Sequence, residues 1–230
     1  MPKLKAQLHI HTRQDPVDNI RHTERQKIDY AAKNGYDVMA ITCHNVMIFN
    51  DDLKKYAEKK RILLIPGIEI GINRKHVLIL NAGVEAQNIK SFADLRKYKE
   101  KNPKCMIIAV HPYFPGWVSL HKRFDENIDL FDAVEYSWFH SKRINRYNKK
   151  AIAAAEKHNL PILATSDNHL LRYFNNTYSF IEADKNIDSI FRAIKEKKVT
   201  FVSHDLTPWK MVCIVTEMWV RQLVKRFTLS

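Results

Sequence analysis

The stretch LKAQLHIH, residues 4–11, is an aliphatic run that ends on two histidines. A run of this length and character predicts a β-strand. Side chains two positions apart on a strand point to the same face. We therefore expect His9 and His11 to project together from the end of this first strand.

Six more runs of this kind follow, and they alternate with predicted helices. The predicted strands span Asp37–Thr42, Arg61–Ile65, His76–Leu80, Met106–Val110, Ala133–Tyr136 and Pro161–Thr165. The predicted helices span Thr23–Asn34, with Thr23 as N-cap and Gly35 just past the end, Ile89–Asn102, Lys142–His158 and Asn186–Lys197. This alternation indicates an α/β fold with mostly parallel strands, either an open doubly wound sheet or a closed barrel. Both place their chemistry at the carboxyl ends of the strands.

Residues that bind metal ions recur where the predicted strands end. His44 follows the second run, Glu69 the third, His111 the fifth, and Asp167 and His169 the seventh, while His76 heads the fourth. The carboxyl ends of parallel strands meet at one rim, so these side chains are expected to converge with those of the first strand. Imidazoles and carboxylates together suit divalent metal ions, and there are too many ligands for one ion. Two or three ions would bind and polarise phosphate oxygens.

Composition and charge narrow the class of protein. The 230 residues suffice for one domain, and 38 Lys and Arg against 25 Asp and Glu give a net charge of +13, which suits anionic partners. A hydrophobic share of 45% excludes a disordered or collagenous chain. No apolar run approaches the ~18 residues of a membrane span. Three scattered cysteines and an opening MPKLK without the apolar core of a signal peptide lead us to expect a cytoplasmic location.

Five short motifs carry a resemblance to a known family. They are LHIHT (8–12), AITCHN (40–45), PGIE (66–69), VHP (110–112) and SDNH (166–169). In this order and spacing the chain resembles the PHP family, named for the polymerase and histidinol phosphatase domain, over roughly residues 4–200. The resemblance implies a distorted (β/α)7 barrel with a trinuclear metal site at its carboxyl rim.

The resemblance also implies a ligand set, carried over position by position. His9, His11, Glu69 and Asp167 correspond to ligands of a first metal; a bridging Glu69 with His76 and His111 to those of a second; and His44 and His169, with an acidic or histidine residue after the HxH motif, to those of a third. Family members carry zinc, manganese or iron, so two or three such ions per chain are expected.

Two positions depart from the family pattern. Cys43 stands where the family usually has an Asp, and we interpret it as a buried thiol, with His44 as the ligand. The segment RQDPVD (13–18) replaces the usual Ser-Asp-Gly. Counting forward from His11 favours Asp15 as the third-metal ligand, whereas counting back from the helix cap favours Asp18. We prefer Asp15, keep Asp18 open, and rank His22 third.

The activity implied by the resemblance is hydrolysis of a phosphoester by metal-bound hydroxide. A small phosphorylated metabolite or nucleotide is the first substrate hypothesis. An exonuclease that removes terminal nucleotides from RNA or DNA is the second, although no separate nucleic-acid module is visible. A non-catalytic regulatory module is the third. A membrane surface is not an expected partner, and the sequence leaves the oligomeric state open.

Further catalytic candidates lie close in sequence to the predicted ligands. Arg143 and Arg172 could neutralise phosphate oxygens, as could Lys75. His140 follows the sixth strand run and could protonate the leaving alkoxide or bind phosphate.

The final residues form a separate pattern. We assign residues 1–204 to the phosphoesterase domain and 205–230 to an amphipathic extension that packs on the barrel. On a helix, one face would carry Trp209, Val212, Thr216, Trp219, Val220, Leu223 and Phe227. Dimerisation or binding to an anionic membrane are alternatives for this extension, and Met211–Val215 could also form a strand.

Overall fold

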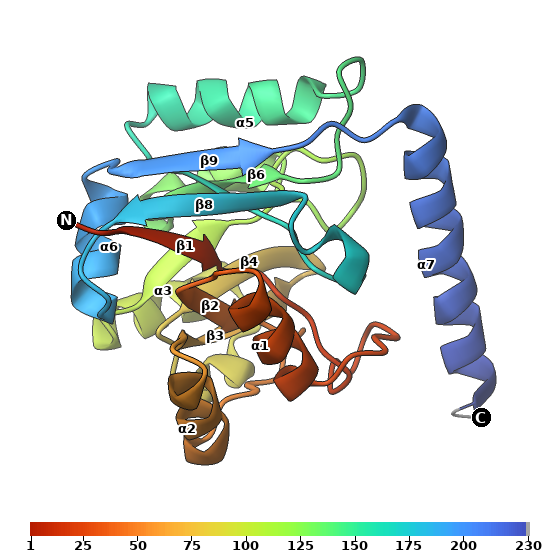
Figure 1. The fold of residues 1–230 in the computed structure, drawn as a ribbon. Helices are drawn as coiled ribbons and strands as arrows, with labels where there is room; N and C mark the ends of the chain where they lie inside the picture. The colour runs from red at the N-terminus through yellow and green to blue at the C-terminus, as the bar shows by residue number, and fades with distance from the viewer. Residues whose placement is uncertain (229–230) are drawn as a thin grey trace.

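A mixed sheet of nine strands forms the centre of the protein (Figure 1). The computed structural model describes residues 1–228, and the side chains through Lys225. In that part of the chain the strands are β1 (Lys3–Gln7), β2 (Val38–Ile41), β3 (Leu63–Ile72), β4 (Lys75–Leu80), β5 (Met106–Ala109), β6 (Ala133–Ser137), β7 (Ile162–Thr165), β8 (Thr177–Glu182) and β9 (Val199–Ser203). Their order in the sheet is β7-β6-β5-β4-β3-β2-β1-β8-β9.

The sheet curls into a nearly closed barrel. Ser179 Oγ on β8 donates a hydrogen bond to the Ala164 carbonyl on β7 and accepts one from the Ala164 amide, both at 2.9 Å. These bonds join the β7 edge to a strand near the opposite edge. The α/β barrel class expected from the sequence is therefore confirmed, and all seven predicted strands are present as β1 to β7.

Two strands beyond the predicted seven complete the wall. β8 pairs antiparallel with β1, and β9 pairs antiparallel with β8. β4 is antiparallel to both β3 and β5, with Gly71 paired to His76. Because β4 runs against its neighbours, its first residues lie beside the carboxyl end of β3. This direction explains how His76, at the start of a strand, reaches the same rim as residues at strand ends.

Helices pack around the outside of the barrel (Figure 1). They are α1 (Glu24–Lys33), α2 (Asp51–Lys59), α3 (Phe92–Lys101), α4 (Lys122–Glu126), α5 (Arg146–Lys157), α6 (Ile187–Lys195) and α7 (Pro208–Thr228), with 3-10 turns η1 (Val84–Asn88), η2 (Ile128–Leu130) and η3 (Leu171–Tyr173). α1 begins as expected at Thr23, whose side chain forms a capping box with Gln26, and ends before Gly35 at φ +69°. Only α7 is long, and no helix of the described chain is long and apolar enough to cross a bilayer.

Apolar side chains fill the barrel and separate it from the helices. Inward-facing residues of the strands, such as Leu4, Val38, Ile65 and Ile108, form one buried cluster together with α6. α6 lies beside the start of β1, and α7 stands on the opposite side of the barrel (Figure 1). The carboxyl rim therefore lies between the barrel core and α7.

The extension forms a helix that packs through an unexpected face. Met211 and Ile214 of α7 are buried against Trp138, Leu170 and Leu206. The face predicted from the sequence is largely exposed instead: Trp209 by 74%, Val212 by 56%, Trp219 by 67% and Val220 by 49%. Residues 211–215 are helical rather than a strand, and the side chain of Phe227 lies outside the described part of the chain.

A buried lysine ties α1 to the loop after β7. Lys27 is fully buried, and its Nζ donates to the Asn168 carbonyl at 3.0 Å and to the Asn168 side-chain oxygen. Burial lowers the pKa of Lys27 from 10.5 to about 7. The ammonium therefore loses its proton near neutral pH in the folded protein but only near pH 10.5 in the unfolded chain.

This shift predicts a pH-dependent contribution to stability. Between pH 7 and 10.5 the unfolded state binds more protons than the folded state at Lys27, so the free energy of unfolding rises with pH across that window. The free energy of unfolding of the wild type should rise, relative to that of Lys27→Met, by a few kcal/mol from pH 7 to about pH 10. Denaturant unfolding of both proteins at several pH values measures it. Lys33→Met, at an exposed position of the same helix, is the control. A difference that stays flat with pH would contradict this account.

Candidate metal centre

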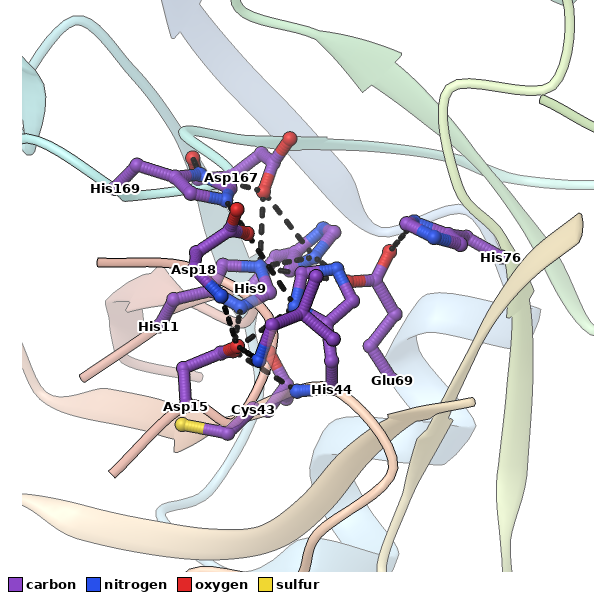
Figure 2. Close-up of polar contacts among 12 residues, drawn as sticks. His9, His11, Asp15, Asp18, Cys43, His44, Glu69, His76, Asp167 and His169 are labelled. Carbon is purple, nitrogen blue, oxygen red and sulfur yellow. Dashed lines mark hydrogen bonds and ion pairs between the residues drawn. The ribbon is translucent and has the colours of Figure 1, made fainter. Parts of the chain in front are cut away.

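The carboxyl rim of the barrel gathers the nine residues preferred as ligands from the sequence; Figure 2 labels all of them except His111, which lies beside Glu69. His9 and His11 follow β1, His44 follows β2, Glu69 lies within β3, and Asp167 and His169 follow β7. Each residue of this cluster contacts at least one other member. The members are His9, His11, Asp15, Asp18, His44, Glu69, His76, His111, Asp167 and His169.

Glu69 lies at the centre of this cluster. Its Oε2 is 2.9 Å from His44 Nε2 and 3.4 Å from His9 Nε2 and from His11 Nε2. Its Oε1 is 3.0 Å from His76 Nδ1 and 3.6 Å from His111 Nε2. The carboxylate is 1% exposed, and neither oxygen has a hydrogen-bond partner. A buried carboxylate with imidazole nitrogens on both sides is arranged to bridge cations.

The histidines of the first strand converge on a second carboxylate. His9 Nε2 and His11 Nε2 are 3.2 Å apart, and they lie 3.4 Å and 3.1 Å from Asp167 Oδ1. The two imidazole nitrogens and the carboxylates of Glu69 and Asp167 thus place four electron-pair donors around one position, where a metal ion could bind. Zinc and similar ions prefer this combination of ligands.

The outer nitrogens of the same two rings are held by carboxylates. His9 Nδ1 is 2.8 Å from Glu135 Oε1, and His11 Nδ1 is 2.8 Å from Asp15 Oδ2. An Nδ1–H that donates to a carboxylate leaves the lone pair on Nε2, which faces the cluster. The arrangement therefore fixes both rings in the tautomer that binds a metal ion.

Two cluster residues adopt strained backbone conformations. His111 has a φ of +32° and Asp167 a φ of +40°, in the left-handed region that non-glycine residues rarely occupy. Each lies two residues past the end of a strand, β5 or β7. Such strain persists where the surrounding structure fixes a side chain in place, and it concentrates at functional sites.

Asp15 and Asp18, the two alternatives of the sequence, occupy different positions. Asp15 Oδ2 accepts hydrogen bonds from the His44 amide at 3.0 Å and lies 2.9 Å from His44 Nδ1, while its Oδ1 accepts from the amides of Val17 and Asp18. Asp18 Oδ2 is 2.8 Å from His169 Nε2 and 3.5 Å from His44 Nδ1. Both carboxylate oxygens of Asp15 thus accept hydrogen bonds from backbone amides, whereas Asp18 Oδ2 faces His44 and His169, the histidines of the predicted third site.

The electrostatics of the cluster are dominated by opposite charges in a buried space. Burial alone would raise the pKa of Glu69, but His76, His44 and His9 hold it well below its usual value. Burial would likewise lower the pKa of His169, but Asp167 and Asp18 raise it to about 9. The nearby carboxylates raise the pKa values of His9 and His44 as well, so without metal ions protonated imidazoles of His9, His44 and His169 neutralise the carboxylates.

Glu135 contacts the cluster and was not predicted from the sequence. It is 1% exposed in β6 and reaches both His9 and the rim, because its Oε2 accepts the His111 amide at 2.7 Å. Thr165 donates to its other oxygen. The available signal was an acidic residue inside an otherwise buried strand, AVEYS. Such a charge is rarely buried without a partner.

The predicted catalytic side chains do not join the cluster. His140 is buried. Its Nε2 is 2.7 Å from Oγ of Ser203, the last residue of β9, and its Nδ1 is 3.2 Å from Oδ1 of Asp205, just after that strand. Arg172 forms an ion pair with Glu217 of α7. Arg143 is exposed. Lys75 donates to the Trp117 carbonyl at 2.7 Å.

Cys43 behaves as a structural thiol. It is fully buried, its Sγ is 3.3 Å from Thr12 Oγ1, and burial raises its pKa to about 12. A thiol with so high a pKa is a poor metal ligand or nucleophile at neutral pH. His22 lines a separate cavity with Arg21 and Arg221, so it lies outside the cluster.

Helix α7 holds the loop that carries both aspartates. Lys225 Nζ donates to the carbonyls of Asp15, Pro16 and Asp18, each at 3.0 Å. Gln222 donates to Asp18 Oδ1. The extension therefore helps to shape the metal-ligand cluster from about two hundred residues away in the sequence.

Comparisons with known proteins show what this chain is similar to. Residues 145–199, which include Asp167 and His169, match a family model described as PHP-associated. An uncharacterized protein of Methanocaldococcus jannaschii is 29% identical over 138 residues, which is 55% of this chain and 78% of that protein.

Several solved structures share the fold. A two-domain protein of Bacteroides vulgatus, described as containing a PHP-like metal-dependent phosphoesterase, superposes with a TM-score of 0.70 at 19% identity over 94% of this chain and 70% of that one. PsfC from Pseudomonas syringae has a TM-score of 0.65 at 14% identity over 100% of both chains. The lesion-specific endonuclease Q of Pyrococcus furiosus has a TM-score of 0.63 at 18% identity, and this chain covers 56% of it. At these identities the likeness shows the fold, and the resemblance to the PHP family is confirmed.

Proposed function

The chain has the PHP fold with a PHP-associated segment, and from this we propose that it is a metal-dependent hydrolase of phosphoesters, acting on a small phosphorylated metabolite or nucleotide. The observation that carries the proposal is the buried Glu69 carboxylate, unpartnered by hydrogen bonds and flanked by imidazole nitrogens on both oxygens. The donor set of imidazoles and carboxylates suits zinc, manganese or iron. Such ions polarise phosphoryl oxygens and lower the pKa of water toward neutrality.

We divide the ligands among three metal positions as the resemblance to the PHP family implies, with one change. His9, His11 and Asp167 with Glu69 would hold one ion, and Glu69 with His76 and His111 a second. His44 and His169 would hold a third together with Asp18, which replaces Asp15 as our preferred ligand. Asp15 and Glu135 are then positioning residues, because each holds an Nδ1 and so directs the ring's Nε2 toward the metal.

The choice between the two aspartates leads to a paired prediction. Asp18→Asn should reduce bound metal by about one ion per chain, because it removes a charged ligand. Asp15→Asn should keep the stoichiometry but weaken metal affinity by about 10- to 100-fold, the usual effect of losing a residue that orients a ligand. Elemental analysis and metal titration of both variants distinguish the roles. Loss of an ion in Asp15→Asn with full occupancy in Asp18→Asn would reverse our assignment.

The activity itself is tested with a substrate panel. Phosphate release is followed from phosphomonoesters, nucleotides and 5′-phosphorylated oligonucleotides, with protein loaded with Mn, Zn or Fe. We expect turnover of phosphomonoesters that His76→Ala removes and that His204→Ala, at an exposed position, retains. Equal activity in both variants would assign the turnover to a contaminant.

A nuclease is the second candidate, favoured by a basic cavity beside the cluster. Arg21, His22, Arg172 and Arg221 line a cavity of about 560 Å³. Arg221 and Leu170 also line a smaller cavity that reaches Asp18 and His169. If a nucleic-acid backbone binds here, affinity for oligonucleotides should fall steeply with salt. A flat salt response would remove this candidate. The third hypothesis, a regulatory module without activity, is not favoured by a cluster that keeps all of its predicted ligands.

A further inference from the structure

A second cavity opens directly onto the metal-ligand cluster. It has a volume of about 200 Å³, and its polar side is formed by His111, Asp167 and His169. The remaining walls are Phe114, Val118, Ser137, Trp138, Phe139, Val215 and Met218. A phosphoester bound at the cluster with its organic group in this cavity would place that group against apolar side chains.

The aromatic part of this wall is fixed by its own packing. Trp138 is 4% exposed and contacts Phe139 edge-on, with ring centroids 5.5 Å apart. Phe139 in turn contacts Phe114 at 5.9 Å, and Phe114 contacts Tyr147 at 5.0 Å. Edge-on aromatic contacts of this kind stabilise a defined ring arrangement. The cavity is thus preformed rather than created by a ligand.

Helix α7 supplies the outer wall. Met218 packs against the cluster of Trp138 and Ile214, and Val215 lines the cavity although it is 55% exposed overall. The C-terminal extension therefore sets the size of the cavity as well as holding the loop of Asp18.

The charges of the cavity wall restrict its occupant further. None of the described side chains that line it is Lys or Arg, whereas three arginines line the separate cavity of about 560 Å³. Away from the two cluster histidines, His111 and His169, a second phosphate or a carboxylate would find no counter-charge here. Hydroxyl groups of a substrate would find one side-chain hydroxyl, that of Ser137, among the otherwise apolar walls. A substrate hydroxyl that is buried without a hydrogen-bond partner weakens binding.

We propose that the organic group of the substrate is compact and apolar, an alkyl chain or a single aromatic ring, held between Trp138, Phe139 and α7. This inference rests on the proposed phosphoesterase function and names its substrate class. The volume sets the upper size, because sites for drug-sized ligands usually span about 300–1,000 Å³. A phosphate ester of an uncharged aliphatic or aryl alcohol matches both the size and the polarity.

The test uses a homologous series of unbranched alkyl phosphates, from methyl to octyl. Leaving-group chemistry is nearly constant beyond the shortest members, so differences report burial. Each added methylene should raise kcat/KM about fourfold, the equivalent of ~0.8 kcal/mol, until the cavity is full. Polyol phosphates with the same number of carbons should be about tenfold poorer or worse. The matching alkylphosphonates, which are not hydrolysed, should show the same trend in binding affinity measured by calorimetry.

A matched pair of variants on α7 locates the effect. Val215→Asp places a charge on the cavity wall and should lower the ratio of kcat/KM for pentyl over methyl phosphate at least tenfold. Val212→Asp changes a residue of equal exposure, 56% against 55%, on the same helix but outside the cavity, and should leave that ratio unchanged.

The outcomes separate the two proposals. Turnover without dependence on chain length, or a preference for polyol phosphates or nucleotides, overturns the apolar substrate class and leaves the phosphoesterase function standing. Absence of turnover for every ester contradicts the proposed phosphoesterase function. The binding affinities of the alkylphosphonates then test on their own whether the cavity prefers apolar groups. A ratio that falls equally in both α7 variants would also overturn the inference.

Discussion

Glu69→Gln should lower kcat/KM by about a thousandfold or more while the protein stays folded. The two oxygens of Glu69 face different histidines, with His44 on one side and His76 on the other. An amide offers one weak oxygen ligand and an NH2 group that would point at a metal ion or an imidazole nitrogen. If Glu69 bridges two metal ions as proposed, the substitution would remove that bridge, and with it most of the stabilisation that the ions would give to charge on the transferring phosphoryl group.

This variant is informative because it conserves shape. Glutamine removes a buried charge without opening a cavity, so circular dichroism and the melting temperature should show a folded protein. Elemental analysis should show fewer bound ions. Glu182→Gln, at an exposed position of β8, is the control for the loss of one carboxylate. Wild-type turnover by a fully loaded Glu69→Gln protein would remove Glu69 from the centre of the mechanism.

Metal removal and return should produce the second large effect. Chelation should abolish activity, and readdition of Mn, Zn or Fe should restore it. An ion at a thousand times its dissociation constant stabilises the folded state by about 4 kcal/mol per site. For a domain of this size, that corresponds to an increase in melting temperature of about 10 °C. Thermal melts and phosphate release measured on the same samples test both effects.

The same experiment should depend on pH in a defined direction. In the chelated protein Asp167 and Asp18 raise the pKa of His169 to about 9, so its imidazole holds a proton at neutral pH. A metal ion must displace that proton, so apparent affinity should increase as the pH rises toward 9. Titration calorimetry in buffers of different ionisation enthalpy should detect proton release. Metal binding that is independent of pH between 6 and 9, with no proton release, would contradict the ligand role of His169.

The sequence predicted most of the cluster because a simple rule applies to it. Residues at the carboxyl ends of parallel strands meet at one rim, and His9, His44, His111 and Asp167 all occupy such positions. His76 required the motif as well, since only the antiparallel direction of β4 brings it to the rim. The extra strands β8 and β9 were missed because polar residues interrupt their sequences, TYSFIE and VTFVS, and because they follow the last motif.

Residues fixed by distant contacts were harder to predict. The loop of Asp15 and Asp18 has no periodic pattern, and its conformation depends on Lys225 and Gln222 of α7. Arg172 was predicted to neutralise phosphate because it is close in sequence to the ligands. In the structure it forms an ion pair with Glu217 instead of facing the cluster.

The orientation of α7 shows a limit of hydrophobic periodicity. Apolar side chains occupy two sides of this helix: Met211 and Ile214 pack inward, while Trp209 and Trp219 face outward. A periodic pattern cannot choose between two apolar faces. The choice is made by the shape of the rim, where Trp138 and Leu170 receive the inward side chains.

The central claim is that this rim holds catalytic metal ions. The most direct measurement is the metal-to-protein ratio, by elemental analysis of protein purified without chelator, with phosphate release followed on the same sample. We predict two or three ions of zinc, manganese or iron per chain, together with turnover of phosphomonoesters. Protein that binds no metal after loading with each of these ions would contradict the account.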